Sequence, residues 1–90
     1  MVKQKDNPSP IHQDSKSILR GLILFNDDVN TFDFVISSLI EVCNHEPEQA
    51  EQCALVAHFK GKCRIRGGDY YELKPLCDEM SLRGLTVSIE

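Results

Sequence analysis

Apolar and polar positions along the chain predict three short strands. Most side chains from Ser17 to Phe25 are apolar, which is typical of a strand that is covered on at least one face. Residues 63–66 alternate apolar and charged side chains, and Gly67-Gly68 is expected to turn the chain after this half-exposed strand. Apolar residues also alternate with threonine and serine over residues 85–89, which predicts a terminal strand.

Two of the intervening segments carry apolar or small residues at helical spacing. From Phe32 to Cys43 they form one continuous stripe, and Asn30 is the expected N-cap, with an acidic residue three positions further on. A second helix is expected to start at Pro47, because the fixed φ of proline suits the first helical position. Gly61 is expected to end this helix, since glycine readily adopts the left-handed conformation found after a helix.

A third helix is expected between two further signals. Asp69 with Glu72 forms a plausible capping pair, an apolar stripe follows, and Gly84 stops it. The predicted order is therefore strand, helix, helix, strand, helix, strand. This order predicts an α/β two-layer sandwich, a three-stranded antiparallel sheet with three helices on one face. Residues 17–90 are expected to form this domain, and the polar, proline-containing residues 1–16 a flexible tail.

Composition and charge narrow the class of protein. With 90 residues, 41% apolar and 27% charged, the chain has room for one globular domain. A net charge of −4 repels phosphate backbones, and there is no basic stripe, so nucleic acid is not expected as a partner. No apolar run approaches the roughly 20 residues that span a bilayer, and the first sixteen residues have no signal-peptide pattern. We therefore expect a cytoplasmic protein without membrane contact.

The four cysteines give little support for a metal site. Cys43, Cys53, Cys63 and Cys77 include no CxxC pair, so a zinc site is not favoured. Disulfides are not expected in a reducing cytosol. The cysteines are interpreted as buried thiols that pack as small hydrophobic residues, and no cofactor is predicted.

Polar oxygens gather where the first predicted strand ends, at Asn26-Asp27-Asp28. Taken alone, this segment also fits a polar turn with helix capping. A divalent cation would need about six oxygens, and no further acidic cluster supplies them. A phosphoacceptor aspartate would fit this position too. An ammonium group needs only three acceptors, which Asn26, a carboxylate and the neutral imidazole of His58 could provide, although a histidine at a helix end is also a common cap.

Two motifs stand out. One is Asn26-Asp27-Asp28 followed by the helix FDFVISSLIEV, and the other is Ala57-His58-Phe59-Lys60-Gly61-Lys62, about thirty residues later. Together they resemble the ClpS family, the adaptors of ATP-dependent Clp proteases. The resemblance covers Ile18 to Glu90. It implies the α/β sandwich derived above and a non-catalytic adaptor. Such an adaptor binds polypeptides whose first residue is bulky and apolar (N-degrons) and delivers them to a Clp AAA+ unfoldase.

The resemblance also implies roles for particular residues. Asn26, Asp27 and His58 would hold the α-amino group, Asp27 partly through an ordered water. The first side chain of the degron would enter an apolar pocket. The resemblance places these residues around it: Asn30, Phe32, Val35, Ala54, Ala57 and Leu85.

The chain differs from the better-known members of the family at this pocket. They typically have Thr in place of Asn30, Met in place of Phe32 and bulkier apolar residues in place of Ala54 and Ala57. Smaller walls at Ala54 and Ala57 would enlarge one side of the pocket and shift the preference among first residues. These alanines are equally consistent with close packing of two helices.

A second contact is implied on the third predicted helix. Glu72 and Lys74 match charged positions of the family that contact the N-terminal domain of the unfoldase, although a solvated helix face would look the same. The tail resembles the family's mobile N-terminal extension.

Two other classes of function remain open on the residues alone. The first is a metal-dependent or phosphoacceptor domain that uses Asp27 and Asp28. The second is a ribosome-associated module of the same fold, which would have no use for Asn26 and His58 as a pair. Catalysis is not expected, because no Ser/His/Asp arrangement or phosphate loop is present.

Overall fold

Six elements follow one another in the predicted order. The structure is a computed structural model that describes residues 18–90, so the tail predicted over residues 1–16 lies outside the described residues. The elements are β1 (Arg20–Phe25), α2 (Phe32–Cys43), α3 (Pro47–Lys60), β2 (Lys62–Gly68), α4 (Tyr70–Leu82) and β3 (Val87–Ile89).

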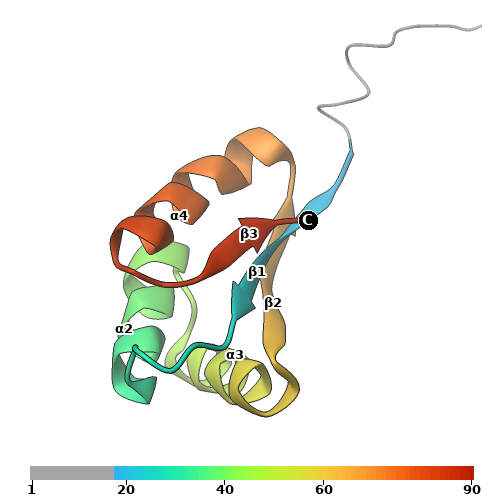
Figure 1. Ribbon diagram of the computed structural model, residues 1–90. Coiled ribbons are helices and arrows are strands. Elements are labelled where there is room, and N and C mark those ends of the chain that lie inside the picture. Colours follow the sequence, from blue (N-terminus) through green and yellow to red (C-terminus); the bar gives the residue numbers. More distant parts are fainter. Residues whose placement is uncertain (1–17) are drawn as a thin grey trace, which may run out of the picture.

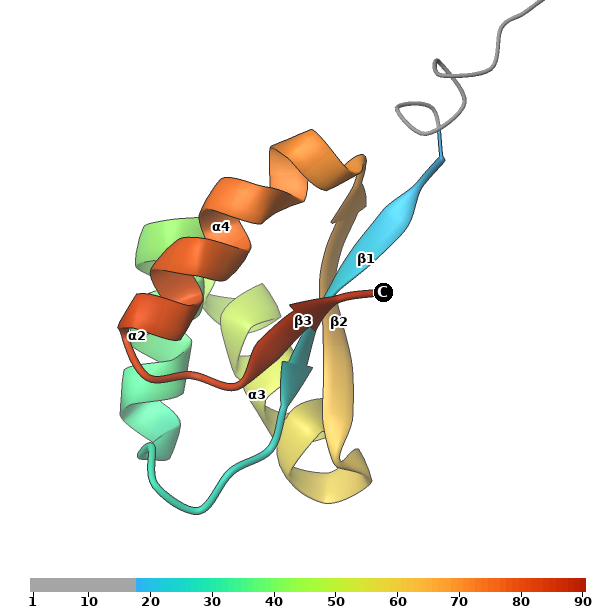
Figure 2. The ribbon, with the colours of Figure 1, turned by 45° about the horizontal axis from the view of Figure 1, so that its top comes forward.

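The three strands form one sheet with β1 at its centre. The strand order is β2-β1-β3, and β1 pairs with both neighbours in the antiparallel direction. All three helices gather on the same side of this sheet, as Figure 1 and the turned view of Figure 2 show. The two-layer sandwich predicted from the sequence is therefore confirmed.

The core lies between the sheet and the helices. Leu22 and Leu24 of β1 are 0% and 2% exposed, and they belong to one cluster with Leu39 of α2 and Leu73 of α4. Burying one such side chain contributes about 1.5–3 kcal/mol to folding. Residues 21–24 of β1 are all buried, in agreement with its nearly continuous apolar sequence, and the side chains of Leu22 and Leu24 are the ones that join the core.

The ends of the strands differ from the predicted ones. Gly67 and Gly68 do not turn the chain: they extend β2 and pair with Gly21 and Arg20. Two facing glycines leave room for the side chain of Arg64, since a Cβ on Gly67 would lie 2.6 Å from Arg64 Nη2. β1 begins at Arg20 rather than Ser17, and β3 begins only at residue 87.

The helix ends follow the predicted signals with one exception. Pro47 begins α3, and Gly61 ends it with a φ of 95°. Asp69 and Glu72 bond each other's backbone N–H groups at the start of α4, at 2.8 and 3.0 Å. The N-cap of α2, however, is Thr31, whose Oγ1 accepts a bond of 3.1 Å from the Phe34 N–H. Asn30 is therefore not the cap.

All four cysteines carry free thiols. Cys43 and Cys53 are buried in the core, and Cys63 and Cys77 are half-buried. Burial raises the pKa of the Cys43 thiol to about 11 and moves the pKa of Cys53 in the same direction. Both groups are consequently neutral at physiological pH and pack as hydrophobic side chains.

Candidate functional site

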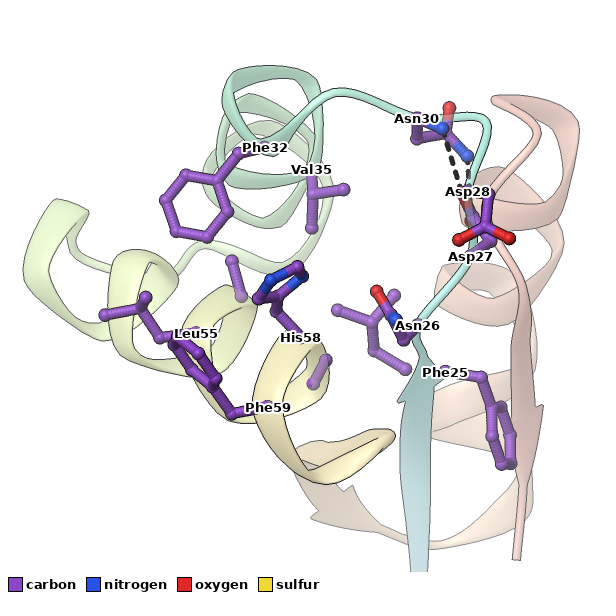
Figure 3. Close-up of a pocket in the computed structure, with 13 residues that line it drawn as sticks. Phe25, Asn26, Asp27, Asp28, Asn30, Phe32, Val35, Leu55, His58 and Phe59 are labelled. Carbon is purple, nitrogen blue, oxygen red and sulfur yellow. Dashed lines mark hydrogen bonds between the residues drawn. The ribbon is translucent and has the colours of Figure 1, made fainter.

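A cavity of about 600 Å³ opens between the end of β1, the start of α2 and the last turns of α3 (Figure 3). The residues that line it come from two separate stretches of chain, 24–35 and 54–59. The size is within the range of pockets that hold small ligands.

Backbone hydrogen bonds hold these two stretches together. The Asn26 N–H donates to the Gly61 carbonyl at 2.9 Å, and the Gly61 N–H donates to Ala57 at 2.9 Å. The end of β1 is thereby fixed beside the last turn of α3, which carries His58. Both Asn26 and His58 line the cavity, and Figure 3 shows their polar side chains on facing sides of it.

Asp27 is held by three hydrogen bonds. Its Oδ1 accepts from the Val29 N–H at 2.9 Å and from the Asn30 N–H at 2.8 Å, and its Oδ2 accepts from Asn30 Nδ2 at 2.9 Å. Burial raises the pKa of Asp27, but these three bonds together outweigh burial and leave the pKa below its ordinary value. The carboxylate therefore stays negative at neutral pH, with about one of its four acceptor positions unused.

The side of the cavity that α2 and α3 form, away from Asp27, is apolar. Ala54 and Ala57 of α3 line the cavity although they are only 4% and 3% exposed, and Phe32 and Val35 of α2 line it as well. Phe32 is 40% exposed, so its ring borders the opening. A ligand that enters here meets a hydrophobic wall next to the polar end of β1 (Figure 3).

The charge of the lining has one sign. Among residues 18–90, Asp27 and Asp28 are the acidic residues that line the cavity, and no lysine or arginine of this part of the chain lines it. Anions are disfavoured in such a site, and a cation gains both charge attraction and hydrogen bonds. The arrangement suits a ligand with a cationic head joined directly to an apolar group.

Eight of the nine residues predicted for the site line this one cavity. They are Asn26, Asp27, Asn30, Phe32, Val35, Ala54, Ala57 and His58.

The ninth residue, Leu85, is 4% exposed in the core and is not among the cavity's lining residues. Five further residues line the cavity and were not assigned to the site: Leu24, Phe25, Asp28, Leu55 and Phe59. A signal existed for the two on α3, because on a helix residue 55 is a neighbour of residue 58, and residue 59 follows one turn after 55.

Glu72 and Lys74 lie on α4 and do not line the cavity. Both already have partners on their own helix. Glu72 accepts a bond in the capping pair, and Lys74 donates to Asp78 at 2.6 and 2.7 Å. Their contact with an unfoldase stays a prediction.

The described residues were also expected to hold no metal ion and to cross no membrane. Within residues 18–90, no group of three or more His, Cys, Asp or Glu side chains is placed to hold a metal ion. In the same part of the chain, none of the helices has the length and apolar character needed to cross a membrane.

Comparisons with known proteins identify relatives. The model of the family described as "ATP-dependent Clp protease adaptor protein ClpS" matches residues 19–88. A curated relative, the ATP-dependent Clp protease adapter protein ClpS of Nitratidesulfovibrio vulgaris, is 38% identical over 55 residues, which cover 59% of this chain. The match spans about half of that relative, 55% of its length.

A solved structure shares the fold. The structure of Agrobacterium tumefaciens ClpS2 bound to L-phenylalaninamide superposes with a TM-score of 0.68 at 22% sequence identity. The superposition covers 80% of this chain and 94% of that one.

Proposed function

The chain belongs to the ClpS family of ATP-dependent Clp protease adaptor proteins, since the family model matches residues 19–88, and from this premise we propose a function for it. It binds polypeptides through a free α-amino group followed by a bulky, apolar first side chain. It then delivers them to a Clp AAA+ unfoldase for degradation. It catalyses no reaction itself.

One observation supports the proposal above all: an amide, a carboxylate and an imidazole border the same cavity as an apolar wall. An α-amine has a pKa of about 7.7–8.0, so it is mostly a cation with three N–H donors at neutral pH. Asn26 Oδ1, a nitrogen of neutral His58 and the free acceptor position of Asp27, directly or through a water, would accept these three bonds. Each charge-assisted bond contributes about 1.5–3 kcal/mol.

The apolar wall would receive the first side chain. Full burial of a leucine or phenylalanine side chain contributes about 1.5–3 kcal/mol, comparable with one of the amine bonds. Recognition therefore requires the free amine and the apolar residue together. The ligand named for the Agrobacterium relative, L-phenylalaninamide, carries both groups on one carbon atom.

Binding of matched peptides tests this proposal. A peptide with leucine first is compared by fluorescence anisotropy with the same peptide acetylated at its amine. We expect acetylation to weaken binding by at least about 100-fold, because losing two bonds removes about 3 kcal/mol or more. Equal affinities of the two peptides would refute the proposal.

Two variants assign the amine contacts to particular residues. Asp27→Asn and His58→Ala should each weaken binding of the free peptide about tenfold or more while the fold is kept. Asp33→Asn is the matched control for Asp27→Asn, because it removes a nearby carboxylate that does not line the cavity. Gln52→Ala serves the same purpose for His58→Ala, as an exposed position of α3 outside this cavity.

The contact with the N-terminal domain of the unfoldase is proposed on α4, through Glu72 and Lys74. Both side chains are exposed and lie outside the peptide cavity, so one adaptor could hold both partners at once. A charge exchange, Glu72→Lys with Lys74→Glu, should weaken binding to that domain and leave peptide affinity unchanged. Ser81→Ala, at an exposed position on the same helix, is the control.

We also propose a cytosolic location. The four cysteines carry free thiols, whereas secreted proteins of this size commonly contain disulfides.

A further inference from the structure

The carboxamide of Asn30 makes two hydrogen bonds that join separate parts of the fold. Its Nδ2 donates to Asp27 Oδ2 at 2.9 Å and to the carbonyl of Gly84 at 2.9 Å. Gly84 belongs to the connection between α4 and β3, at a φ of 87°. We call this pair of bonds the Asn30 bridge. A primary amide has two N–H donors, so the bridge uses both of them.

The Asn30 bridge holds one of the two oxygens of the Asp27 carboxylate, Oδ2. The backbone N–H groups of Val29 and Asn30 fix Oδ1, but only the Asn30 side chain contacts Oδ2 among the hydrogen bonds of the described residues. Without that contact Oδ2 would lose this partner, and the carboxylate would be held through Oδ1 alone, with more freedom about its Cβ–Cγ bond. We propose that Asn30 is a positioning residue, whose bridge fixes the Asp27 carboxylate at the cavity wall and anchors it to the α4–β3 connection.

The consequence for binding rests on the proposed function, in which Asp27 faces the α-amino group of the ligand. An orientation fixed before binding costs less conformational entropy when the ligand arrives. A side chain with a single donor, such as threonine, could make one of the two bonds but not both. Asn30 would therefore affect the amine site through Asp27.

The charged and titratable groups near the Asn30 bridge come from the loop of Asp27, from α3 and from the residue next to Gly84. In the same loop lies Asp28, α3 contributes His58, and α2 lines the cavity with apolar residues only. Beside Gly84 lies Arg83, whose guanidinium bonds Glu41 at 2.8 Å and lies 3.7 Å from Glu79, so its charge is compensated.

Removal of the bridge should therefore be visible in the titration of Asp27. The bond from Asn30 Nδ2 is one of the three that lower the pKa of Asp27. A hydrogen bond to the charged form favours that form, so deleting the bond must raise the pKa. Binding would then be lost at a higher pH as the solution is acidified.

Carbon-13 NMR of the Asp27 carboxyl tests the inference without any ligand. In Asn30→Ala we expect the pKa of Asp27 to rise by about half a unit or more, and in Asn30→Thr by less, because one donor remains. Thr31→Ala is the control: it removes the neighbouring N-cap bond of α2 but makes no contact with Asp27. It should lower stability and leave this pKa unchanged. If Asn30→Ala does not fold, Asn30→Thr provides the comparison.

Peptide affinity is measured on the same variants. With a leucine-first peptide we expect affinity to fall about threefold to tenfold in Asn30→Ala at pH 7. The acid limb of the binding profile, meaning the pH range over which affinity is lost on acidification, should move to higher pH. An unchanged pKa in both Asn30 variants would overturn the inference, as would a raised pKa with unchanged affinity and an unchanged acid limb. If the natural chain bound no free-amine peptide while Asn30→Ala still raised the pKa, the proposed function would fail and the bridge would stand.

Discussion

Filling the apolar wall of the cavity should change which first residue the chain prefers. Ala54 lines the cavity but is only 4% exposed, so a larger side chain there must point into the space that the ligand's first side chain would occupy. Ala54→Leu adds three carbon atoms, each worth about 0.8 kcal/mol of apolar burial. A large first residue such as phenylalanine then loses room and much of its burial, about 1.5–3 kcal/mol or roughly 10- to 150-fold in affinity.

A small first residue should respond in the opposite direction. Valine leaves part of the natural cavity unfilled, and the leucine at position 54 would supply the missing contacts. We therefore expect the ratio of phenylalanine to valine affinity to fall by at least about tenfold in Ala54→Leu. Anisotropy of peptides that differ only in residue one measures this ratio, which cancels any general loss of folded protein.

Gln52→Leu is the control for the added side chain. It places the same leucine at an exposed position of α3 that does not line this cavity, so the ratio should stay within twofold of that of the natural chain. If Ala54→Leu binds peptides and keeps the original ratio, Ala54 does not border the first side chain, and the alanine serves helix packing alone.

Four further predictions concern stability and reactivity. Thr31→Ala should lower the free energy of unfolding by about 1 kcal/mol in urea titrations, because the N-cap bond to the Phe34 N–H is lost; an unchanged value would mean that the bond contributes nothing. Leu39→Ala should cost about 2–5 kcal/mol in the same assay, since Leu39 is fully buried in the core; a cost below 1 kcal/mol would contradict that packing. The folded-state pKa of Asp27 is lowered, so its contribution to stability is present above the unfolded pKa of about 3.9 and is lost as the pH falls through the folded value. In urea titrations the free energy of unfolding of Asp27→Asn should accordingly be lower than that of the natural chain at pH 7, and this difference should disappear in acid. A difference that does not depend on pH would argue against a lowered pKa of Asp27. Cys43 and Cys53 should react slowly with a thiol reagent in the native protein at pH 7.5 and readily in denaturant, because both thiols are buried with raised pKa values; rapid native labelling of both would show that this region opens.

The sequence predicted the order of the elements because each element carries its own local signal. The stripe of α2, Pro47, Gly61 and the Asp69–Glu72 pair are patterns of short range, and the structure places a helix or a helix end at each. The family resemblance added the residues of the site, which no local pattern could have brought together across about thirty positions.

Two of the errors concern contacts between distant segments. Asn30 looked like an N-cap, but its side chain bonds Gly84, and Thr31 takes that role. Gly67 looked like part of a turn, yet the facing strand pairs with it and the side chain of Arg64 needs the room beside it. Such choices depend on which partner a residue meets, and sequence patterns of short range do not contain that information.

The central position of β1 has a consequence for how the molecule is made. β1 precedes both of its partners along the chain, and Leu22 pairs with Ile89 at the far end of the described residues. During synthesis on the ribosome β1 is therefore made before β2 and β3, and one of its edges stays unpaired until β3 has been synthesised. Pairing between such distant segments is slow compared with helix formation. Because the Phe25 N–H donates to the Thr86 carbonyl at 2.8 Å, the end of β1 should reach its final position only after the segment that leads into β3 has been made.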